Sequence, residues 1–475
     1  MNSVFRVAYE EWRLLWRNKV ALISILLLVL LTSISALTAW NQHQYANAER
    51  TRYQLQVNTE FAAQPDRHPH RMVHYGQFAF KPINPLASFD TGIETYTGNT
   101  LYLEGHRQNS ANFGDVHQSS LIMRFGQLNP SFLLQILAPL LLIFIGHTCV
   151  SRERENGTLR LLIIQGLRFK QVVIGKLLVL IGVSLIILLP TLLMFMLIFI
   201  STPVSISLLI LLITSYSVWL LLWAIIVIAA SVIVNSGKDA LIILLVLWTT
   251  TIILIPRLGS DLVSWSQPLP TRFETDIYIS KKLAATGDSH NPNDPHFNEF
   301  RKKILKQYSV IRIEDLPVNY KGLLAIEGER LTSALFNQYT EINFTIQKKQ
   351  LNYINKLSTI SPLIALRRIS MILSGTDLES YEYFLKQAES HRFKLIQRLN
   401  YLQAEKFTYA TDKSSRESRI NREYWQGISD FKYQAETQTS TLQRALPMVY
   451  VLVIWLIVLF GLLLLICRNR RTLLL

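Results

Sequence analysis

A long apolar stretch followed directly by a charged loop sets the class of this protein. Phe132–Val150 reads FLLQILAPLLLIFIGHTCV, and Ser151–Gln171 continues as SRERENGTLRLLIIQGLRFKQ. A helix needs about 20 consecutive apolar residues to cross the hydrocarbon core of a bilayer. The first stretch therefore predicts a membrane span, and the second predicts the polar segment that leaves the bilayer.

Further stretches of the chain have the same apolar character. Half of the 475 residues are apolar and only 17% are charged. This composition excludes an intrinsically disordered chain and favours a membrane protein. We predict an all-α polytopic fold with six transmembrane helices, at 20–40, 132–150, 172–200, 206–234, 240–256 and 445–467.

The basic residues indicate which side of the membrane each connection faces. Short cytoplasmic segments of membrane proteins collect Lys and Arg. Basic residues are dense in 1–19, 151–171 and 468–475, and Lys238 lies in the turn before the fifth span. Placing these segments and both termini in the cytoplasm accounts for most of the net charge of +15. The lipid bilayer is thus an expected partner, and nucleic acid is not.

This topology leaves two large extracytoplasmic insertions, 41–131 and 257–444. The larger insertion is predicted to be helical, because apolar residues recur every three or four positions over 331–357 and again over 381–402. The smaller one contains several prolines and glycines and is predicted to be mixed in structure. The two helical stripes favour a hairpin or small bundle that stands on the fifth and sixth spans.

Two helix ends in the larger insertion are predicted from local signals. Pro362 is expected to begin a short helix, because proline is well tolerated in the first turn. Gly375 is expected to end it, as glycine favours the left-handed conformation found there. Thr376 followed by Glu379 fits a capping box for the next helix.

Residues 1–19 are predicted to form an amphipathic helix at the membrane interface. Its tryptophan rings suit the depth of the lipid headgroups, and its arginines suit anionic lipid. The apolar face contains Val4, Phe5, Ala8, Trp12, Leu15 and Trp16, and the polar face contains Arg6, Glu10, Arg13 and Arg17.

Motifs of catalysis and of ion-driven transport are missing from the sequence. The six predicted spans contain no carboxylate, which argues against a proton or sodium relay. No GxxxxGK[ST] phosphate loop is found, so this chain is not expected to be an enzyme or to bind a cofactor. His68, His70 and His74 match no standard zinc spacing, so no metal site is assigned, and whether they bind metal stays open.

The loop at 151–171 is the most informative segment. Its residues predict a short charged helix, a break at Gly157 with Thr158 free to cap, and a second amphipathic helix. Leu159 and Leu162 belong to the apolar face of that second helix. A short helix lying across the membrane surface is suited to insert into a groove on a cytoplasmic partner.

This loop resembles the one in the permease subunits of type-2 ATP-binding-cassette (ABC) exporters. The pattern shared with that family is an acidic-basic run, Gly-Thr-Leu, a leucine pair, an arginine and a Gly-Lys that opens the next span. The proline of the family pattern is replaced by Gln165–Gly166. The matching residues are Glu153, Glu155, Gly157, Thr158, Leu159, Leu161, Leu162, Arg168, Gly175 and Lys176.

The resemblance implies a half-transporter in the bacterial cytoplasmic (inner) membrane. A cytoplasmic ABC ATPase subunit, which would hold ATP and Mg²⁺, and a second permease subunit are its implied partners. The resemblance also implies that the loop couples ATP hydrolysis to movement of the spans. The residues that it assigns to this coupling are Arg152, Glu153, Arg154, Glu155, Gly157, Thr158, Leu159, Leu162 and Arg168.

The two insertions are similar to those of a bacterial subfamily of these permeases. The resemblance is carried by Asn84-Pro85-Leu86 with Gly92, and by Ser361-Pro362 followed by 373–377. The insertions are expected to gate the outer exit or to dock an extracytoplasmic partner.

Other functions remain open from the sequence alone. The closest alternative is a subunit that transmits mechanical signals across the membrane without carrying a substrate. A membrane-anchored sensor or scaffold with a ligand-binding outer domain is another, which the loop motif disfavours. The transported substrate is not identified, although apolar spans without charge suit an amphipathic cargo.

Overall fold

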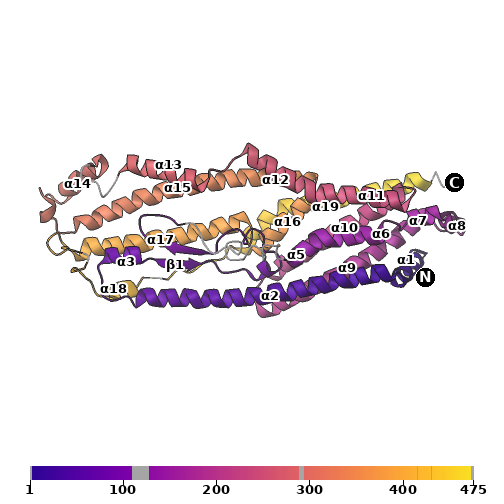
Figure 1. Cartoon of the computed structure of the whole chain (residues 1–475), viewed down its shortest axis with the longest axis horizontal. Helices are drawn as coiled ribbons and strands as arrows, with labels where there is room; N and C mark the ends of the chain where they lie inside the picture. The colour runs from indigo at the N-terminus through magenta and orange to yellow at the C-terminus, as the bar shows by residue number, and fades with distance from the viewer. Residues whose placement is uncertain (1–2, 110–127, 288–293, 415, 429, 472–475) are drawn as a thin grey trace.

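The protein is an elongated bundle of helices (Figure 1). The computed structural model describes residues 3–109, 128–287, 294–414, 416–428 and 430–471. Both ends of the chain lie at the same end of the molecule, beside two short helices, α7 and α8 (Figure 1). We call this end the terminal face. The opposite half of the molecule, which contains residues 41–109 and the described residues between 267 and 437, is called the extension.

Among the described residues, six helical segments are long and apolar enough to cross a membrane. The prediction of a helical membrane protein with six spans is therefore confirmed. The six segments are Lys19–Ala62, Pro130–Glu155, Phe169–Ser201, Ile206–Ile233, Gly237–Ser266 and Gln438–Arg468.

Two of the spans contain a π-helical turn that ends two residues before a proline. Pro139 follows the first π-helix and Pro256 the second, and wider turns of this kind accommodate the backbone hydrogen bond that proline cannot donate. The elements at the spans are α1 (Ser3–Arg17), α2 (Lys19–Ala62), α5 (Pro130–Phe132), π-helix η3 (Leu133–Leu137), α6 (Ala138–Gly146), α7 (Ser151–Glu155), α8 (Thr158–Ile164), α9 (Phe169–Ser201), α10 (Ile206–Ile233), α11 (Gly237–Trp248), π-helix η4 (Thr249–Leu254), α12 (Ile255–Ser266) and α19 (Gln438–Arg471).

The extension consists of long helices and one small hairpin. Strands β1 and β2 pair antiparallel, with Gln77 opposite Leu103. Residues 110–127 and 288–293, which fall in the two predicted insertions, lie outside the described residues. The elements here are α3 (Pro69–Tyr75), β1 (Gln77–Phe80), η1 (Pro85–Ser88), β2 (Thr100–Leu103), α13 (Arg272–Thr286), α14 (Pro295–Gln307), η5 (Ile313–Asp315), α15 (Tyr320–Lys356), η6 (Leu357–Thr359), α16 (Pro362–Ser374), α17 (Leu378–Lys406) and α18 (Glu423–Gln426).

Helix α2 continues well past the predicted end of the first span. The sequence predicts a span at 20–40 and a less regular segment after it, but α2 is one helix of 44 residues. At 1.5 Å per residue it is about 66 Å long, roughly twice the hydrocarbon thickness of a bilayer. Neither glycine nor proline interrupts the chain before Pro65, so no residue stops the helix at the membrane surface. The fifth span likewise continues through α12 to Ser266.

Helix α16 ends as predicted, but the next helix begins one residue later than the predicted cap. Gly375 has a φ of 66°, in the left-handed region. The N-cap of α17 is Asp377, whose side chain accepts a hydrogen bond from the backbone N–H of Ser380. The capping box predicted at Thr376 is therefore wrong, because an Asp one position further along offers a competing cap.

The segment after η1 packs tightly against the turn between α16 and α17. Gly92 has a φ of 47°, and a Cβ atom built on it would lie 2.4 to 2.8 Å from atoms of Thr376. The N–H of Ile93 donates to the carbonyl of Thr376 at 3.0 Å. Gly375 in turn lies against the side chain of Asn84. We call this contact between the two predicted insertions the junction.

The core of the spans continues into the junction. Helix α10 is central, and Tyr216, Trp219 and Trp223 on it are buried in the same cluster as apolar side chains of α16. The Tyr216 hydroxyl lies 2.9 Å from the Ser370 Oγ, and Ser370 donates to the buried carboxylate of Asp90. Burial raises the pKa of Asp90, although the hydrogen bond from Ser370 opposes this.

Candidate functional site

The terminal face carries two short helices that project beyond the spans. Helix α7 ends at Glu155, Asn156 is its C-cap, and Gly157 follows with a φ of 68°. This left-handed conformation is accessible to glycine at little cost, and it turns the chain into α8. A second glycine, Gly166, has a φ of 91° and lies just beyond the end of α8. The two glycines therefore delimit α8 as a short separate element.

Thr158 has a different role from the one predicted. Gly157, which has no side chain, is the N-cap of α8. The Thr158 hydroxyl instead reaches back to α7, where it donates to the backbone carbonyl of Glu153 at 3.1 Å and to the carboxylate of the same residue. Thr158 thus fixes the angle between the two short helices.

A buried lysine joins three elements at the terminal face. The Lys176 Nζ lies 2.6 Å from the Glu11 Oε2 and 3.4 Å from the Glu153 Oε1. Only 2% of the Lys176 side chain is exposed, so it does not extend to the membrane surface as a residue at the end of a span often does. The lysine therefore connects α9 to both α1 and α7. We call Lys176, Glu11 and Glu153 the lysine network.

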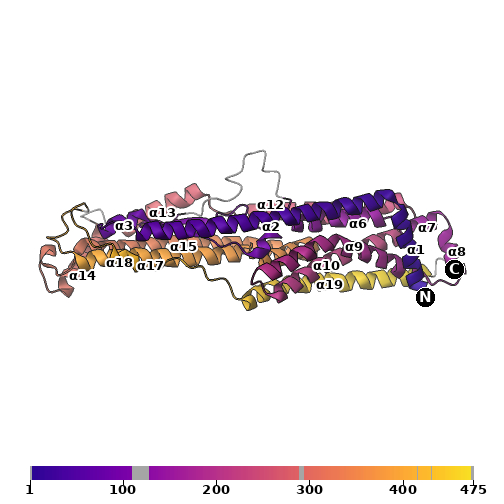
Figure 2. The same cartoon turned by 90° about the horizontal axis from the view of Figure 1, so that it is seen from below.

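Helix α1 is held against α9 by packing as well as by this network. A Cβ atom on Gly175 would lie 2.7 Å from Val7, and one on Gly182 would lie 3.1 Å from the ring of Trp12. These glycines let α1 approach closely. Figure 2 shows α1 running across the ends of the long spans, which is the direction expected of a helix parallel to the membrane surface.

Arg154 and Glu155, which follow Glu153 on α7, bind the ends of neighbouring spans. The Arg154 guanidinium donates to the backbone carbonyls of Val232 and Val234, at the C-terminal end of α10. The Glu155 Oε1 accepts the backbone N–H of Gly237 at 3.0 Å, at the start of α11. Helix ends leave such groups without partners inside the helix, so α7 caps both spans.

The outward surface of α8 is formed by residues outside the set predicted to couple to a partner. Leu159 is 1% exposed and belongs to the core of the spans, and Leu162 is half-buried. Leu161 and Ile164, by contrast, are 58% and 72% exposed. Of the remaining candidates, Gly157 and Arg168 are exposed and Arg152 is half-buried.

The residues that hold this loop to the spans therefore differ from the residues that are exposed for contact with another protein. Within this chain, Glu153, Arg154 and Glu155 contact α9, α10 and α11, and their predicted role in coupling to a partner stays a prediction. Leu161 and Ile164 lie three residues apart, on one side of a helix. They form an exposed apolar pair on α8, which is connected through Thr158 to α7, and α7 is bound to the spans by charged side chains.

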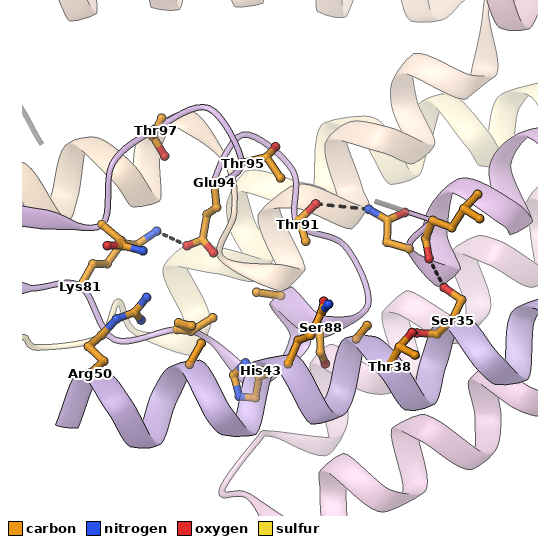
Figure 3. A pocket seen from close by; sticks show the side chains of 18 of the residues that line it. Ser35, Thr38, His43, Arg50, Lys81, Ser88, Thr91, Glu94, Thr95 and Thr97 are labelled. Carbon is orange, nitrogen blue, oxygen red and sulfur yellow. Dashed lines mark hydrogen bonds and ion pairs between the residues drawn. The ribbon is translucent and has the colours of Figure 1, made fainter. Parts of the chain in front are cut away.

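A second candidate site is a pocket beside α2, with a volume of about 350 Å³. Leu31 and Ile34 from α2 form its apolar part, and the ion pair between Lys81 and Glu94 lies at its polar part (Figure 3). The Lys81 Nζ lies 2.5 Å from the Glu94 Oε1. Pockets of this size hold small ligands, and this one suits a molecule with both an apolar and a polar portion.

Comparisons with known proteins concern the extension. Residues 272–434 match the model of a family described as a domain of unknown function (DUF3526). The match begins at the first residue of α13 and ends just before α19. None of the curated proteins matches the chain.

Proposed function

We propose that the chain is the membrane-spanning permease subunit of an ABC transporter, of the exporter type, and that α8 docks on a separate cytoplasmic ATPase. The observation that carries the proposal is the exposed pair Leu161 and Ile164 on a short helix at the terminal face. An apolar pair on a short helix fits a groove on a partner protein. The resemblance of the loop to type-2 ABC permeases supports the same function.

In this proposal the charged residues of α7 transmit movement rather than bind the partner. A push on α8 reaches α7 through Thr158 and then α9 through the pair of Glu153 and Lys176. The same push reaches α10 through Arg154 and α11 through Glu155. Because charge-assisted hydrogen bonds are short and directional, these contacts suit the transfer of force.

The same arrangement supports an orientation in the membrane. Arg160 on the proposed docking helix and Lys170 near it are exposed, and basic residues of this kind are typical of cytoplasmic segments. We place the terminal face and both termini in the cytoplasm of a bacterium and the extension outside. The fifth and sixth spans expose most of their apolar side chains, which leaves a face for a second permease subunit within the bilayer.

The docking proposal predicts a large loss of partner binding when the exposed pair is charged. In the double variant Leu161→Asp/Ile164→Asp, we expect the amount of ATPase that copurifies in detergent to fall at least tenfold, because two carboxylates would enter an apolar groove. Ile311→Asp is the matched control, since Ile311 is 90% exposed on the extension. This control should retain the ATPase.

Two further measurements make the docking result decisive. Both variants should insert in the membrane and elute from a sizing column as the wild type does, because the substituted side chains are exposed. Unchanged copurification of the ATPase with the double variant would contradict the proposal. So would the absence of any ABC ATPase from the purified wild-type complex.

A subunit that transmits mechanical signals without carrying a substrate is the second candidate function. Helix α2 favours it, because one continuous helix connects the terminal region to the extension. The pocket beside α2 distinguishes the two functions. If the permease moves an amphipathic cargo, this pocket is the place where such a cargo would bind on its outward path.

Filling the pocket with a large side chain is expected to separate these functions. Ile34→Trp should reduce the amount of bound lipid-like molecules seen by native mass spectrometry at least several-fold, with the ATPase still attached. Ile23→Trp is the control, since Ile23 is exposed on α2 and does not line the pocket. Equal ligand occupancy in the two variants would favour mechanical transmission.

A further inference from the structure

Three histidines meet on the extension, far from the terminal face. His70 and His74 lie one turn apart on α3, and His106 lies in the loop after β2. The Nε2 atoms of His70 and His74 are 3.2 Å apart. One ring nitrogen from each of the three residues lies within 4.8 Å of the other two.

His68, the first histidine of the sequence motif, belongs to a different contact. Its Nδ1 accepts the backbone N–H of His70 and caps α3, and its Nε2 lies 3.2 Å from the buried Asp412 Oδ1. Both nitrogens are thus engaged in holding the helix. Burial lowers the pKa of His68, although the nearby Asp412 opposes this. His68 therefore orients α3 and does not join the cluster.

Backbone hydrogen bonds to neighbouring elements fix the position of His106. Its φ is 68°, a conformation that is uncommon for residues other than glycine. The backbone N–H of His106 donates to the Glu329 Oε2 at 2.9 Å, and the preceding residue, Gly105, donates its N–H to the carbonyl of Val73 on α3. The loop is thereby fixed to α3 on one side and to α15 on the other.

The carboxylate of Glu329 also lies near the imidazole of His106. The His106 Nδ1 lies 3.9 Å from the Glu329 Oε2. Glu329 is fully buried and is held in turn by Arg392, at 2.7 Å. A carboxylate behind one ring nitrogen is the usual partner of a histidine whose other nitrogen binds a metal. One ring nitrogen of His106 lies within 4.8 Å of a ring nitrogen of each of the other two histidines.

The spacing of the nitrogens fits a metal shell. Zinc binds imidazole at 2.0 to 2.1 Å in tetrahedral geometry, which places two ligand nitrogens about 3.3 Å apart. His70 and His74 already have nearly this separation, and small side-chain rotations would bring His106 to it. Three protein ligands leave the fourth position for water or another exchangeable ligand.

We propose that His70, His74 and His106 form a binding site for a divalent transition metal such as Zn²⁺. Neutral imidazole nitrogens favour zinc, copper or nickel over Mg²⁺ and Ca²⁺, which prefer oxygen. The bound metal would join α3 to the loop after β2, which is fixed to α15. The site thus connects the segment between the first two spans to the helices between the fifth and the sixth. It is independent of the docking surface on α8.

Zinc titration of the full-length protein tests this site. The protein is purified in detergent, stripped with a chelator and titrated with Zn²⁺ in competition with a chromophoric chelator. We expect one zinc ion per chain, and an affinity at least tenfold lower in His74→Ala. His74 is exposed, so this variant should keep its fold. His296→Ala is the control, because His296 lies on the extension beside Glu327, outside the cluster.

Binding of Co²⁺ gives a spectroscopic signal that reports on metal coordination by the histidines and not on the fold alone. Co²⁺ in the wild-type site should give the visible absorption bands of a tetrahedral complex, and His106→Ala should abolish them. Mg²⁺ and Ca²⁺ should not compete. Wild-type zinc affinity in His74→Ala, or no bound zinc in the wild type at a tenfold excess of metal, would overturn the proposal.

Discussion

Replacing Lys176 by methionine should destabilise the terminal face more than any other single charge removal there. The substitution leaves the carboxylates of Glu11 and Glu153 close together without the cation that lies between them. Breaking a buried ion pair costs about 3 to 5 kcal/mol. We expect about 3 kcal/mol in the free energy of unfolding, the lower end of this range, because the two carboxylates are 12% and 18% exposed. Denaturation in mixed micelles measures the change.

A compensated variant separates the charge from the packing. In Lys176→Met/Glu11→Gln/Glu153→Gln all three charges are removed, and replacing a whole buried ion network by neutral groups is often close to neutral in stability. This triple variant should recover most of the loss. Lys238→Met is the control for removing a cation at the same face, since Lys238 is exposed. A stable single variant would show that the lysine network does not hold α1 and α7 to α9.

The Lys176→Met variant also tests how movement of α8 is transmitted to the spans. If Glu153 transmits movement from α8 to α9, Lys176→Met should leave ATPase binding intact while α1 becomes accessible. Hydrogen exchange of the α1 amides reports on that accessibility. The docking variants on α8 should have the opposite pattern, with normal exchange in α1 and no bound ATPase. The two sets of variants thus distinguish the anchor from the contact surface.

Local patterns in the sequence predicted much of this fold. The six spans follow from runs of apolar residues, and the end of α16 follows from Gly375, because these signals lie within a few neighbouring residues. The continuation of α2 was missed, since a change from apolar to polar residues was taken as the end of the helix. A helix can continue past the apolar stretch where other elements support its polar part, and the first proline after the span is Pro65.

The details of the candidate site depended on contacts between distant residues. The burial of Lys176 depends on Glu11, which lies 165 positions away in sequence and gives the lysine a partner. The apolar stripe of α8 was assigned to a partner, although Leu159 packs in the core of this chain. Leu161 and Ile164 fall outside that stripe, and this departure from the pattern was the available signal. No local pattern marked His106 as a site residue, because it comes to lie beside α3 only through the hairpin of β1 and β2.

The junction is the second place where a single substitution should have a large effect. In Gly92→Ala, the new Cβ would lie 2.4 Å from the Thr376 Oγ1 and 2.5 Å from the Thr376 carbonyl oxygen. The left-handed conformation costs about 1 to 2 kcal/mol for alanine, and overpacking adds roughly 1 to 3 kcal/mol. We expect a loss of about 2 to 5 kcal/mol in the free energy of unfolding. Exchange of the Ile93 amide, which donates to Thr376, should rise as well.

Comparison with Gly157→Ala separates the cost of the steric clash in Gly92→Ala from the cost of the left-handed conformation. Gly157 also has a left-handed φ, of 68°, but no described atom outside its own chain neighbours lies within 4 Å of a Cβ placed there. This variant should therefore show only the conformational cost of about 1 to 2 kcal/mol. Thr376→Gly in the Gly92→Ala background removes the side-chain part of the clash and leaves the carbonyl, so stability should return in part. Equal losses for Gly92→Ala and Gly157→Ala would mean that conformational strain, and not the packing of one insertion on the other, makes glycine necessary at the junction.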